Sequence, residues 1–133
     1  MKVYLAAPYS AKDLIKGYAN ELRASGVEVT SSWLDEPHKP NTQMHDLTHE
    51  EHQGYAVRDV QDVQVADILV LFTDSTKTII RAGRHVEFGI AVQRKIPIYV
   101  VGDLYENIFH HLPGVTHFKS WTILSQMLIT NCR

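Results

Sequence analysis

Glu87 is the side chain of this sequence that is best placed for covalent chemistry. It ends the segment 83–87 (GRHVE), which opens with a glycine, and an apolar run at 96–101 (IPIYVV) follows. This pattern predicts a helix from Gly83 to about Arg94 and then a buried strand. A carboxylate in the first or second turn of that helix lies near the positive end of the helix dipole, which favours its ionised form. Glu87 is therefore a candidate nucleophile.

Asp59 and Tyr4 could take part in the same chemistry. Asp59 lies eight residues before Asp67, on a predicted helix that leads into an apolar strand, and Tyr4 lies in the apolar run 3–6. Two carboxyl groups in different environments can divide the work of glycosyl transfer, since one attacks the sugar carbon and the other handles the proton of the leaving group. Asp59 reaches the same place as Glu87 only if it lies near the start of its helix.

Each of these three residues also has a purely structural interpretation. Glu87 could be a solvated helix residue that balances Arg84 or Arg94. Asp59 could form an ion pair with Arg58, and Tyr4 could simply belong to the core. The functional hypothesis therefore depends on the combination of the three residues and not on any one of them.

Apolar runs alternate with helical patterns along the chain, which predicts the elements that position these residues. Strands are expected at 3–6, 27–30, 67–72, 97–101 and 115–118, and helices between 10 and 26, at 55–65, at 83–94, as one turn at 107–111, and from 121 onwards. Ser10 is the expected N-cap of the first helix, and the polar stretch 31–53 is expected to be a long loop. The alternation predicts one domain over 1–133: a flavodoxin-like, doubly wound parallel sheet of about five strands in three αβα layers.

In such a fold the loops after the first, third and fourth strands share one edge of the sheet. The loop after the first strand is therefore expected to face the helix that begins at Gly83 and to bind substrate. Its residues are Ala7, Pro8, Tyr9 and Ser10. Trp33 follows the second strand at the mouth of the expected cleft, where its indole could stack on a base or could cover the sheet edge.

Composition excludes several classes of function. The 133 residues are 44% hydrophobic and 21% charged, as in an ordinary globular protein. A net charge of -2 gives no electrostatic reason to bind a nucleic acid polymer or an anionic membrane, and no apolar run approaches the ~20 residues that span a bilayer. The single cysteine, Cys132, excludes an internal disulfide, so we expect a cytoplasmic protein. Dinucleotide and P-loop motifs are absent, and no cofactor is expected.

Three histidines form the pattern HxxxHxxH at His45, His49 and His52. Helical spacing would align them on one face, where they could bind zinc. The pattern is not the HExxH arrangement of zinc proteases. A solvated, pH-sensitive loop is the better interpretation, and we expect no metal site.

Three segments in order resemble the motifs of the nucleoside 2-deoxyribosyltransferase superfamily, which includes the 2'-deoxynucleoside 5'-phosphate N-hydrolases. The segments are 3–10 (VYLAAPYS), Asp59 followed by 65–70 (VADILV), and 83–91 (GRHVEFGIA). The resemblance implies an enzyme that cleaves the N-glycosidic bond of a 2'-deoxynucleoside or its 5'-monophosphate. Glu87 would attack the anomeric carbon, Asp59 would protonate the departing base, and Tyr4 would orient the nucleophile. Transfer to a second base is expected, with water as the alternative acceptor.

The resemblance also implies a homodimer or larger homo-oligomer with shared active sites, to which Asn107 would contribute in a neighbouring subunit. The acidic residue that many transferases carry before the motif glycine, and the serine of the hydrolases, are absent, because Arg81 and Ala82 stand there. Arg81 and Arg84 could instead bind a 5'-phosphate, since guanidinium groups suit phosphate geometry, or they could be solvated surface charges. The remaining alternatives are a non-catalytic nucleotide-binding protein and a flavodoxin-like domain with another ligand.

Overall fold

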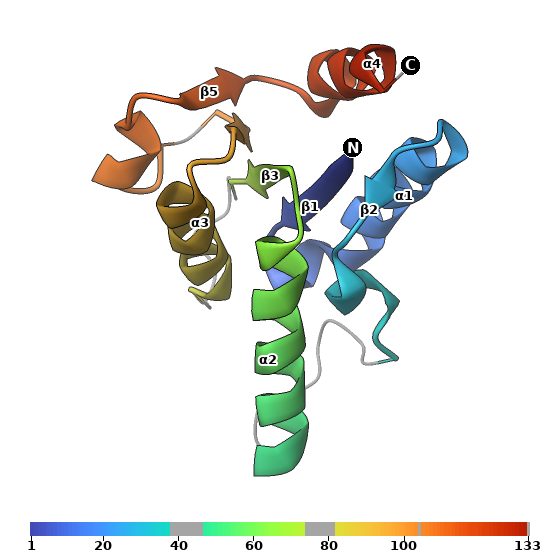
Figure 1. Ribbon diagram of the computed structural model, residues 1–133, viewed down its shortest axis with the longest axis vertical. Helices are drawn as coiled ribbons and strands as arrows, with labels where there is room; N and C mark the ends of the chain where they lie inside the picture. The colour runs from blue at the N-terminus through green and yellow to red at the C-terminus, as the bar shows by residue number, and fades with distance from the viewer. Residues whose placement is uncertain (38–46, 74–81, 104, 133) are drawn as a thin grey trace.

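A computed structural model describes residues 1–37, 47–73, 82–103 and 105–132 (Figure 1). Within these ranges five parallel strands form one sheet in the order β2-β1-β3-β4-β5. The strands are β1 (Lys2–Ala6), β2 (Glu28–Val29), β3 (Ile68–Phe72), β4 (Ile98–Val101) and β5 (Val115–Phe118). The α-helices are α1 (Lys12–Ala24), α2 (His49–Gln64), α3 (Gly83–Arg94) and α4 (Trp121–Asn131), and the short 3-10 helices are η1 (Tyr9–Ala11), η2 (Ser32–Asp35) and η4 (Ile108–His111).

The strand order confirms the predicted flavodoxin-like sheet. The chain moves from β1 to its neighbour β2 and then crosses back to β3 on the other side of β1. Tyr4 of β1 lies beside Leu69 of β3 in the parallel register. The direction of winding reverses between β1 and β3, and ligands of this fold bind beyond the carboxyl ends of the strands at such a reversal.

The helices lie in two layers, one on each face of the sheet. Right-handed crossovers place α1 on one face and place α2 and α3 on the other, because the winding reverses after β2. Tyr18 of α1 stacks on Trp121 of α4, with ring centroids 4.8 Å apart, so α4 shares the face of α1. On the opposite face Arg94 of α3 donates hydrogen bonds to the carbonyls of Val63 and Ala66, at 3.1 and 2.6 Å, where α2 ends.

The two central strands form the middle of the core. Val3 to Ala6 of β1 and Leu69 to Leu71 of β3 are 0% exposed. Helices cover both faces of a parallel sheet, which explains why these strands are continuous apolar runs in the sequence. None of the helices in the described ranges is both long and apolar enough to cross a membrane.

The start of α2 differs from the prediction. The helix begins at His49, six residues before the expected Tyr55, so the end of the expected loop is helical. Thr48 and Glu51 form a capping box: the Thr48 hydroxyl accepts from the Glu51 amide, and the Glu51 carboxylate accepts from the Thr48 amide, both at 3.1 Å. The Thr-x-x-Glu pattern at 48–51 was the sequence signal for this start.

Two further sequence expectations need correction or fall partly outside the described residues. Ser10 does not cap the first helix: it lies inside η1, and α1 begins at Lys12 with Ala11 at the N-cap and no side-chain cap. The turn of η1 uses the residues that were expected to start the helix. Of the three histidines in the HxxxHxxH pattern, His49 and His52 lie in α2, whereas His45 is outside the described residues.

Candidate functional site

The Tyr4 hydroxyl donates a hydrogen bond to Oε2 of Glu87. Tyr4 lies in β1, two residues before the strand ends, and is 0% exposed. Glu87 is the fifth residue of α3, which begins at Gly83 as predicted. The structure therefore brings two of the three predicted catalytic residues into direct contact at the carboxyl end of the central strand.

Burial raises the pKa of Glu87 to about 8; the hydrogen bond from Tyr4 opposes this effect, and the nearby charges of Asp59 and Asp62 add to it. We expected the helix dipole to favour the ionised form of Glu87, and this expectation was wrong. The dipole acts mainly within the first turn of a helix, and Glu87 lies beyond that turn. Removal of the carboxylate from water therefore dominates.

Asp59 is the eleventh of the 16 residues of α2, so it does not lie near the start of its helix, as we expected it must. The helix is longer than predicted, and its N-terminal half projects beyond the sheet (Figure 1), so the middle of α2 can lie at the sheet edge. Asp59 raises the pKa of both Tyr4 and Glu87, which places its charge within electrostatic reach of both. Among the described residues, Oδ1 of Asp59 is buried without a hydrogen-bond partner.

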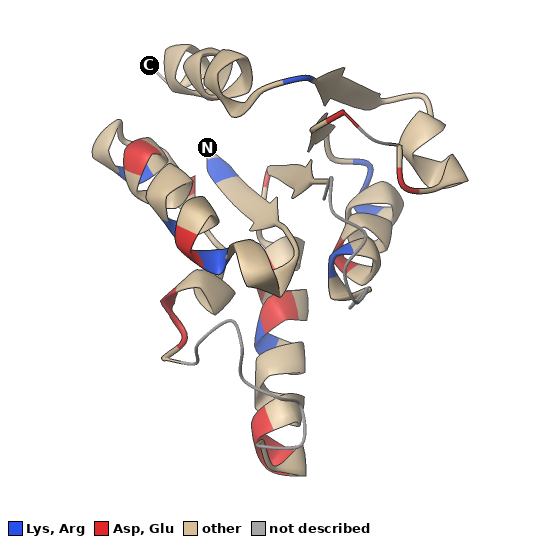
Figure 2. Cartoon of the chain, turned by 180° about the vertical axis from the view of Figure 1, so that it is seen from behind, with Lys and Arg blue, Asp and Glu red and all other residues tan. Residues whose placement is uncertain are grey.

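Three effects raise the pKa of Asp59 to about 7: burial, which is the largest, the charge of Glu36 and the charge of Asp62; Arg58 opposes them. Arg58 forms an ion pair with Oε1 of Glu36, whose side chain is 6% exposed. Asp62 accepts a hydrogen bond of 2.9 Å from the amide of Ser32 in η2. Figure 2 shows the resulting mixture of acidic and basic positions on the half of α2 nearest the sheet. Asp59 is thus a half-buried acid that exchanges its proton near neutral pH.

The loop after β1 only partly faces the predicted site. Ala7, Pro8 and Tyr9 are half-buried, and Ser10 is exposed. Pro8 and Ser10 line a hollow on the α1 and α4 face of the sheet, together with the aromatic side chains of Tyr18, Phe72 and Trp121. Neither Glu87 nor Asp59 lines this hollow.

Trp33 is part of the core around the sheet edge. It is 5% exposed, and its indole N–H donates a hydrogen bond of 2.9 Å to the carbonyl of Leu5. Its ring centroid lies 5.9 Å from that of Tyr9, at an interplanar angle of 41°. Because so little of the indole is exposed, we favour the interpretation that Trp33 covers the sheet edge over the interpretation that it stacks on a base.

The next residues were expected to bind a 5'-phosphate or another part of the substrate, or to complete the active site of a neighbouring subunit. Most of them either contact other groups of this chain or lie outside the described residues. Arg84 is 6% exposed and forms an ion pair with Oε2 of Glu106 at 2.6 Å. Asn107 caps η4, because its Oδ1 accepts a hydrogen bond of 2.9 Å from the amide of Phe109. Gly83 is exposed at the first turn of α3. Arg81 lies outside the described residues.

A polar cluster beside this ion pair was not apparent from the sequence. His85, Glu106 and His110 bring potential metal-ligand atoms within 4.8 Å of one another, although they come from α3 and from the chain after β4. Their hydrogen bonds do not fit a metal centre. Arg84 occupies the Glu106 carboxylate, and the Glu106 amide donates to Nδ1 of His110 at 3.3 Å, which leaves the proton of the neutral imidazole on Nε2. The cluster is therefore interpreted as a hydrogen-bonded support for the start of α3.

The sequence matches no protein-family model and no curated protein. Two solved structures share the fold over almost the whole chain. The CMP N-glycosidase BcmB of Clostridium botulinum has a TM-score of 0.60 and 17% identity, and the match covers 96% of this chain and 98% of that one. A 2-deoxyribosyltransferase of Bacillus psychrosaccharolyticus has a TM-score of 0.71 and 18% identity, with coverage of 94% and 90%. Identities this low show that the fold is shared.

Proposed function

We propose that this protein is an enzyme that cleaves the N-glycosidic bond of a 2'-deoxynucleoside, or of its 5'-monophosphate, through a covalent ester on Glu87. The hydrogen bond from Tyr4 to Glu87, with the half-buried carboxyl of Asp59 within electrostatic reach, is the observation that carries this proposal. A double displacement at a sugar carbon needs an oriented carboxylate and a second group that exchanges a proton with the leaving group.

In the first step an oxygen of the Glu87 carboxylate forms a bond to the anomeric carbon while the bond from that carbon to the base breaks. The bonding electron pair goes to the base nitrogen, which takes the proton of Asp59. Because Tyr4 binds Oε2, we assign the attack to Oε1 and the orientation of the carboxylate to Tyr4. The phenol also stabilises the carboxylate before it attacks.

In the second step a nitrogen of an incoming base attacks the anomeric carbon and displaces Glu87. The proton of that nitrogen returns to Asp59. Two displacements on opposite faces retain the configuration of the sugar carbon. If water takes the place of the base, the same steps release free deoxyribose or its 5-phosphate.

The first step requires that Glu87 is ionised and that Asp59 is protonated. Their pKa values, about 8 for Glu87 and about 7 for Asp59, place most singly protonated molecules in the opposite arrangement. The reactive arrangement is therefore a minority form near neutral pH, and the two groups titrate as a pair.

Transfer to a second base is the reaction that we propose, with hydrolysis as the second candidate. The 2-deoxyribosyltransferase of like fold supports transfer, and the N-glycosidase of like fold supports hydrolysis. The engagement of Arg84 by Glu106 removes one expected phosphate ligand, which favours nucleosides over nucleotides. A nucleotide-binding protein without turnover is the alternative from another class.

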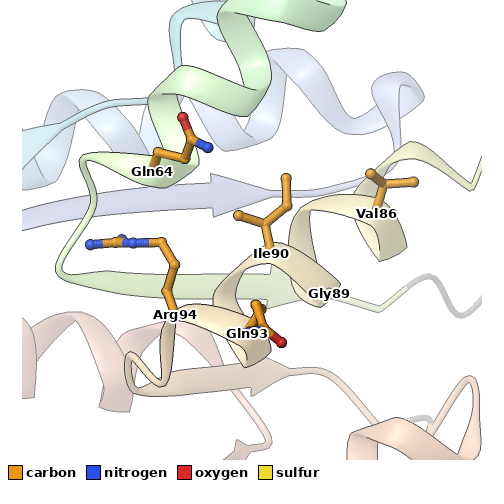
Figure 3. Close-up of a pocket in the computed structure, with 6 residues that line it drawn as sticks. All are labelled: Gln64, Val86, Gly89, Ile90, Gln93 and Arg94. Carbon is orange, nitrogen blue, oxygen red and sulfur yellow. The ribbon is translucent and has the colours of Figure 1, made fainter.

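We further propose a homodimer or larger homo-oligomer with shared active sites, located in the cytoplasm. Apolar side chains on the outer surface of α2 and α3 support the assembly, since Val57 is 51% and Val86 is 61% exposed. Val86 belongs to a groove between the two helices (Figure 3), which is lined by Gln64, Val86, Gly89, Ile90, Gln93 and Arg94. The lone cysteine, Cys132, fits a reducing compartment.

The deciding experiment is a panel of deoxynucleosides and their 5'-monophosphates, incubated with and without an acceptor base and followed by chromatography of bases and nucleosides. Glu87→Gln removes the nucleophile at nearly constant volume, and Glu28→Gln, at an exposed position of β2, is the matched control. We expect exchange of bases by the wild type and by Glu28→Gln only. Release of free sugar without exchange would assign hydrolysis, and turnover by Glu87→Gln would contradict the proposal.

A further inference from the structure

Arg58 and Asp59 are adjacent in α2, yet the cation pairs with a different acid. Nη2 of Arg58 bonds to Oε1 of Glu36, and the guanidinium lies 5.1 Å from the ring centroid of Tyr55. Within the described residues no ion pair joins Arg58 to Asp59, and Oδ1 of Asp59 has no hydrogen-bond partner. A half-buried carboxyl, whose Oδ1 has no donor among the described residues, thus lies next to a guanidinium that another acid holds.

Glu36 is fixed where it can hold this cation. It follows η2 directly, and its backbone carbonyl accepts a hydrogen bond from the Lys12 ammonium. Its side chain is 6% exposed, whereas that of Arg58 is 36% exposed. The acid is therefore the anchored partner, and the arginine is the group whose position depends on the pair.

Without the Glu36 charge, the acids left near Arg58 in α2 are Asp59 and Asp62, and Asp62 already accepts a hydrogen bond from the Ser32 amide. A guanidinium beside a carboxyl favours the carboxylate, because opposite charges stabilise each other strongly in a buried site. Asp59 would then lose its proton and could no longer supply it to a departing base. The proposed chemistry needs the protonated acid.

We infer that Glu36 is a positioning residue for Asp59: it holds the Arg58 guanidinium in an ion pair of its own and so keeps the Asp59 proton available for transfer. This inference rests on the proposed function. It assigns a role to an acid outside the three proposed active-site residues.

Charged and titratable groups reach Asp59 from four elements. Glu36 follows η2, Arg58 and Asp62 share α2 with Asp59, Tyr4 comes from β1, and Glu87 comes from α3. Asp62 accepts a hydrogen bond from the Ser32 amide on Oδ2, which occupies one of its two carboxylate oxygens. Glu36 and Arg58 are thus the two groups whose removal should act on Asp59 in opposite directions.

The test compares Glu36→Gln, Arg58→Gln and the double variant over pH 5 to 9. Glu36→Gln keeps a hydrogen-bond acceptor for Arg58 and removes only the charge. Asp35→Asn is the matched control, since Asp35 precedes Glu36 but its 52% exposed side chain pairs with Arg23 and Lys16. The two readouts are the rate of base release by the whole protein and the carbon-13 NMR titration of the Asp59 carboxyl, which needs no turnover.

We expect Glu36→Gln to release base about tenfold more slowly at pH 8 for each unit by which the pKa of Asp59 falls. At pH 5 the rate should match the wild type, since Asp59 is protonated in both proteins there. Arg58→Gln should shift the Asp59 titration to higher pH, and the double variant should return it toward the wild-type position. The Asp35→Asn profile should equal that of the wild type.

A loss that is equal at every pH, or an Asp59 titration that does not move in Glu36→Gln, would overturn the inference. The proposed function fails in a different way, because the wild type would then release no base at any pH. The NMR titration still decides the role of Glu36 in that case. Circular dichroism of each variant separates a shifted titration from a failure to fold.

Discussion

The Tyr4 hydroxyl and the Glu87 carboxylate meet across 83 residues of sequence and join β1 to α3. Burial raises the pKa of Tyr4 well above its ordinary value of 10.0, and the charge of Glu87 raises it further. Tyr4 therefore stays protonated over the whole working range of pH. Toward the ionised Glu87 its hydroxyl can act only as a donor, which fixes the direction of this hydrogen bond and the orientation of the carboxylate.

Tyr4→Phe should slow base release most strongly at low pH. The variant removes the one interaction that lowers the pKa of Glu87, so the carboxylate becomes rarer below its pKa. A lost hydrogen bond to a charged group costs about 2 kcal/mol, or roughly thirtyfold in rate. The deficit should shrink above pH 9, as Glu87 becomes ionised in both proteins. Rate profiles of the two proteins check this, and a constant deficit would point to a role in packing alone.

The rate of the wild type should peak between pH 7 and pH 8. Base release needs Glu87 ionised and Asp59 protonated, and their pKa values are about 8 and about 7. Below the peak protonation of Glu87 lowers the rate, and above it ionisation of Asp59 does, each by about tenfold per pH unit. Initial rates under saturating substrate measure the profile. A rate that is constant from pH 5 to pH 9 would exclude this pair as the reacting groups.

Glu87→Gln should make the fold more stable at alkaline pH. The folded-state pKa of Glu87, about 8, lies above its ordinary value of 4.5, so burial of the protonated acid is tolerated and burial of the carboxylate is not. The free energy of unfolding of the wild type therefore falls as the pH rises from 4.5 through 8. The glutamine variant has no ionisable group at this position, so it does not lose that contribution. Thermal unfolding at pH 5 and pH 9 should show a variant advantage at pH 9 that fades at pH 5. An equal difference at both values would contradict the raised pKa.

Trp33→Leu should lower the free energy of unfolding by about 3 kcal/mol, because it removes a buried ring and a hydrogen bond to the Leu5 carbonyl. The same variant should leave the substrate KM unchanged, since the indole is 5% exposed. Urea unfolding and steady-state kinetics measure the two quantities. A tenfold rise in KM would restore the role in base stacking.

The strands and the start of α3 could be predicted from the sequence because their apolar runs and the glycine at 83 are local signals. The contact between Tyr4 and Glu87 was predictable from the strand order, which brings the ends of β1 and β3 together. The burial that raises the pKa of Glu87 could not be predicted from the sequence, because it depends on how α2 and α3 pack on the sheet.

The ion-pair partners of Arg84 and Arg58 could not be predicted from the sequence either. Arg84 and Glu106 are 22 residues apart, and so are Arg58 and Glu36. Neither spacing is a helical or strand period that would reveal the pair. Both pairs form only when the loops after β2 and β4 fold back on the helices, and each changes what its arginine can bind.

The three proposed active-site residues, Tyr4, Asp59 and Glu87, come from β1, α2 and α3, and this has a consequence for how the protein is made. β1 pairs with β3, whose first paired residue, Ile68, is separated from Val3 by the whole of α1, β2 and α2. Parallel pairing over such a distance forms late in folding, because a long loop must close first. A nascent chain therefore carries Tyr4 for most of its synthesis with no carboxylate to orient. The reactive centre comes into being only when α3 has emerged and docked, so a half-made or partly unfolded chain holds no activated nucleophile.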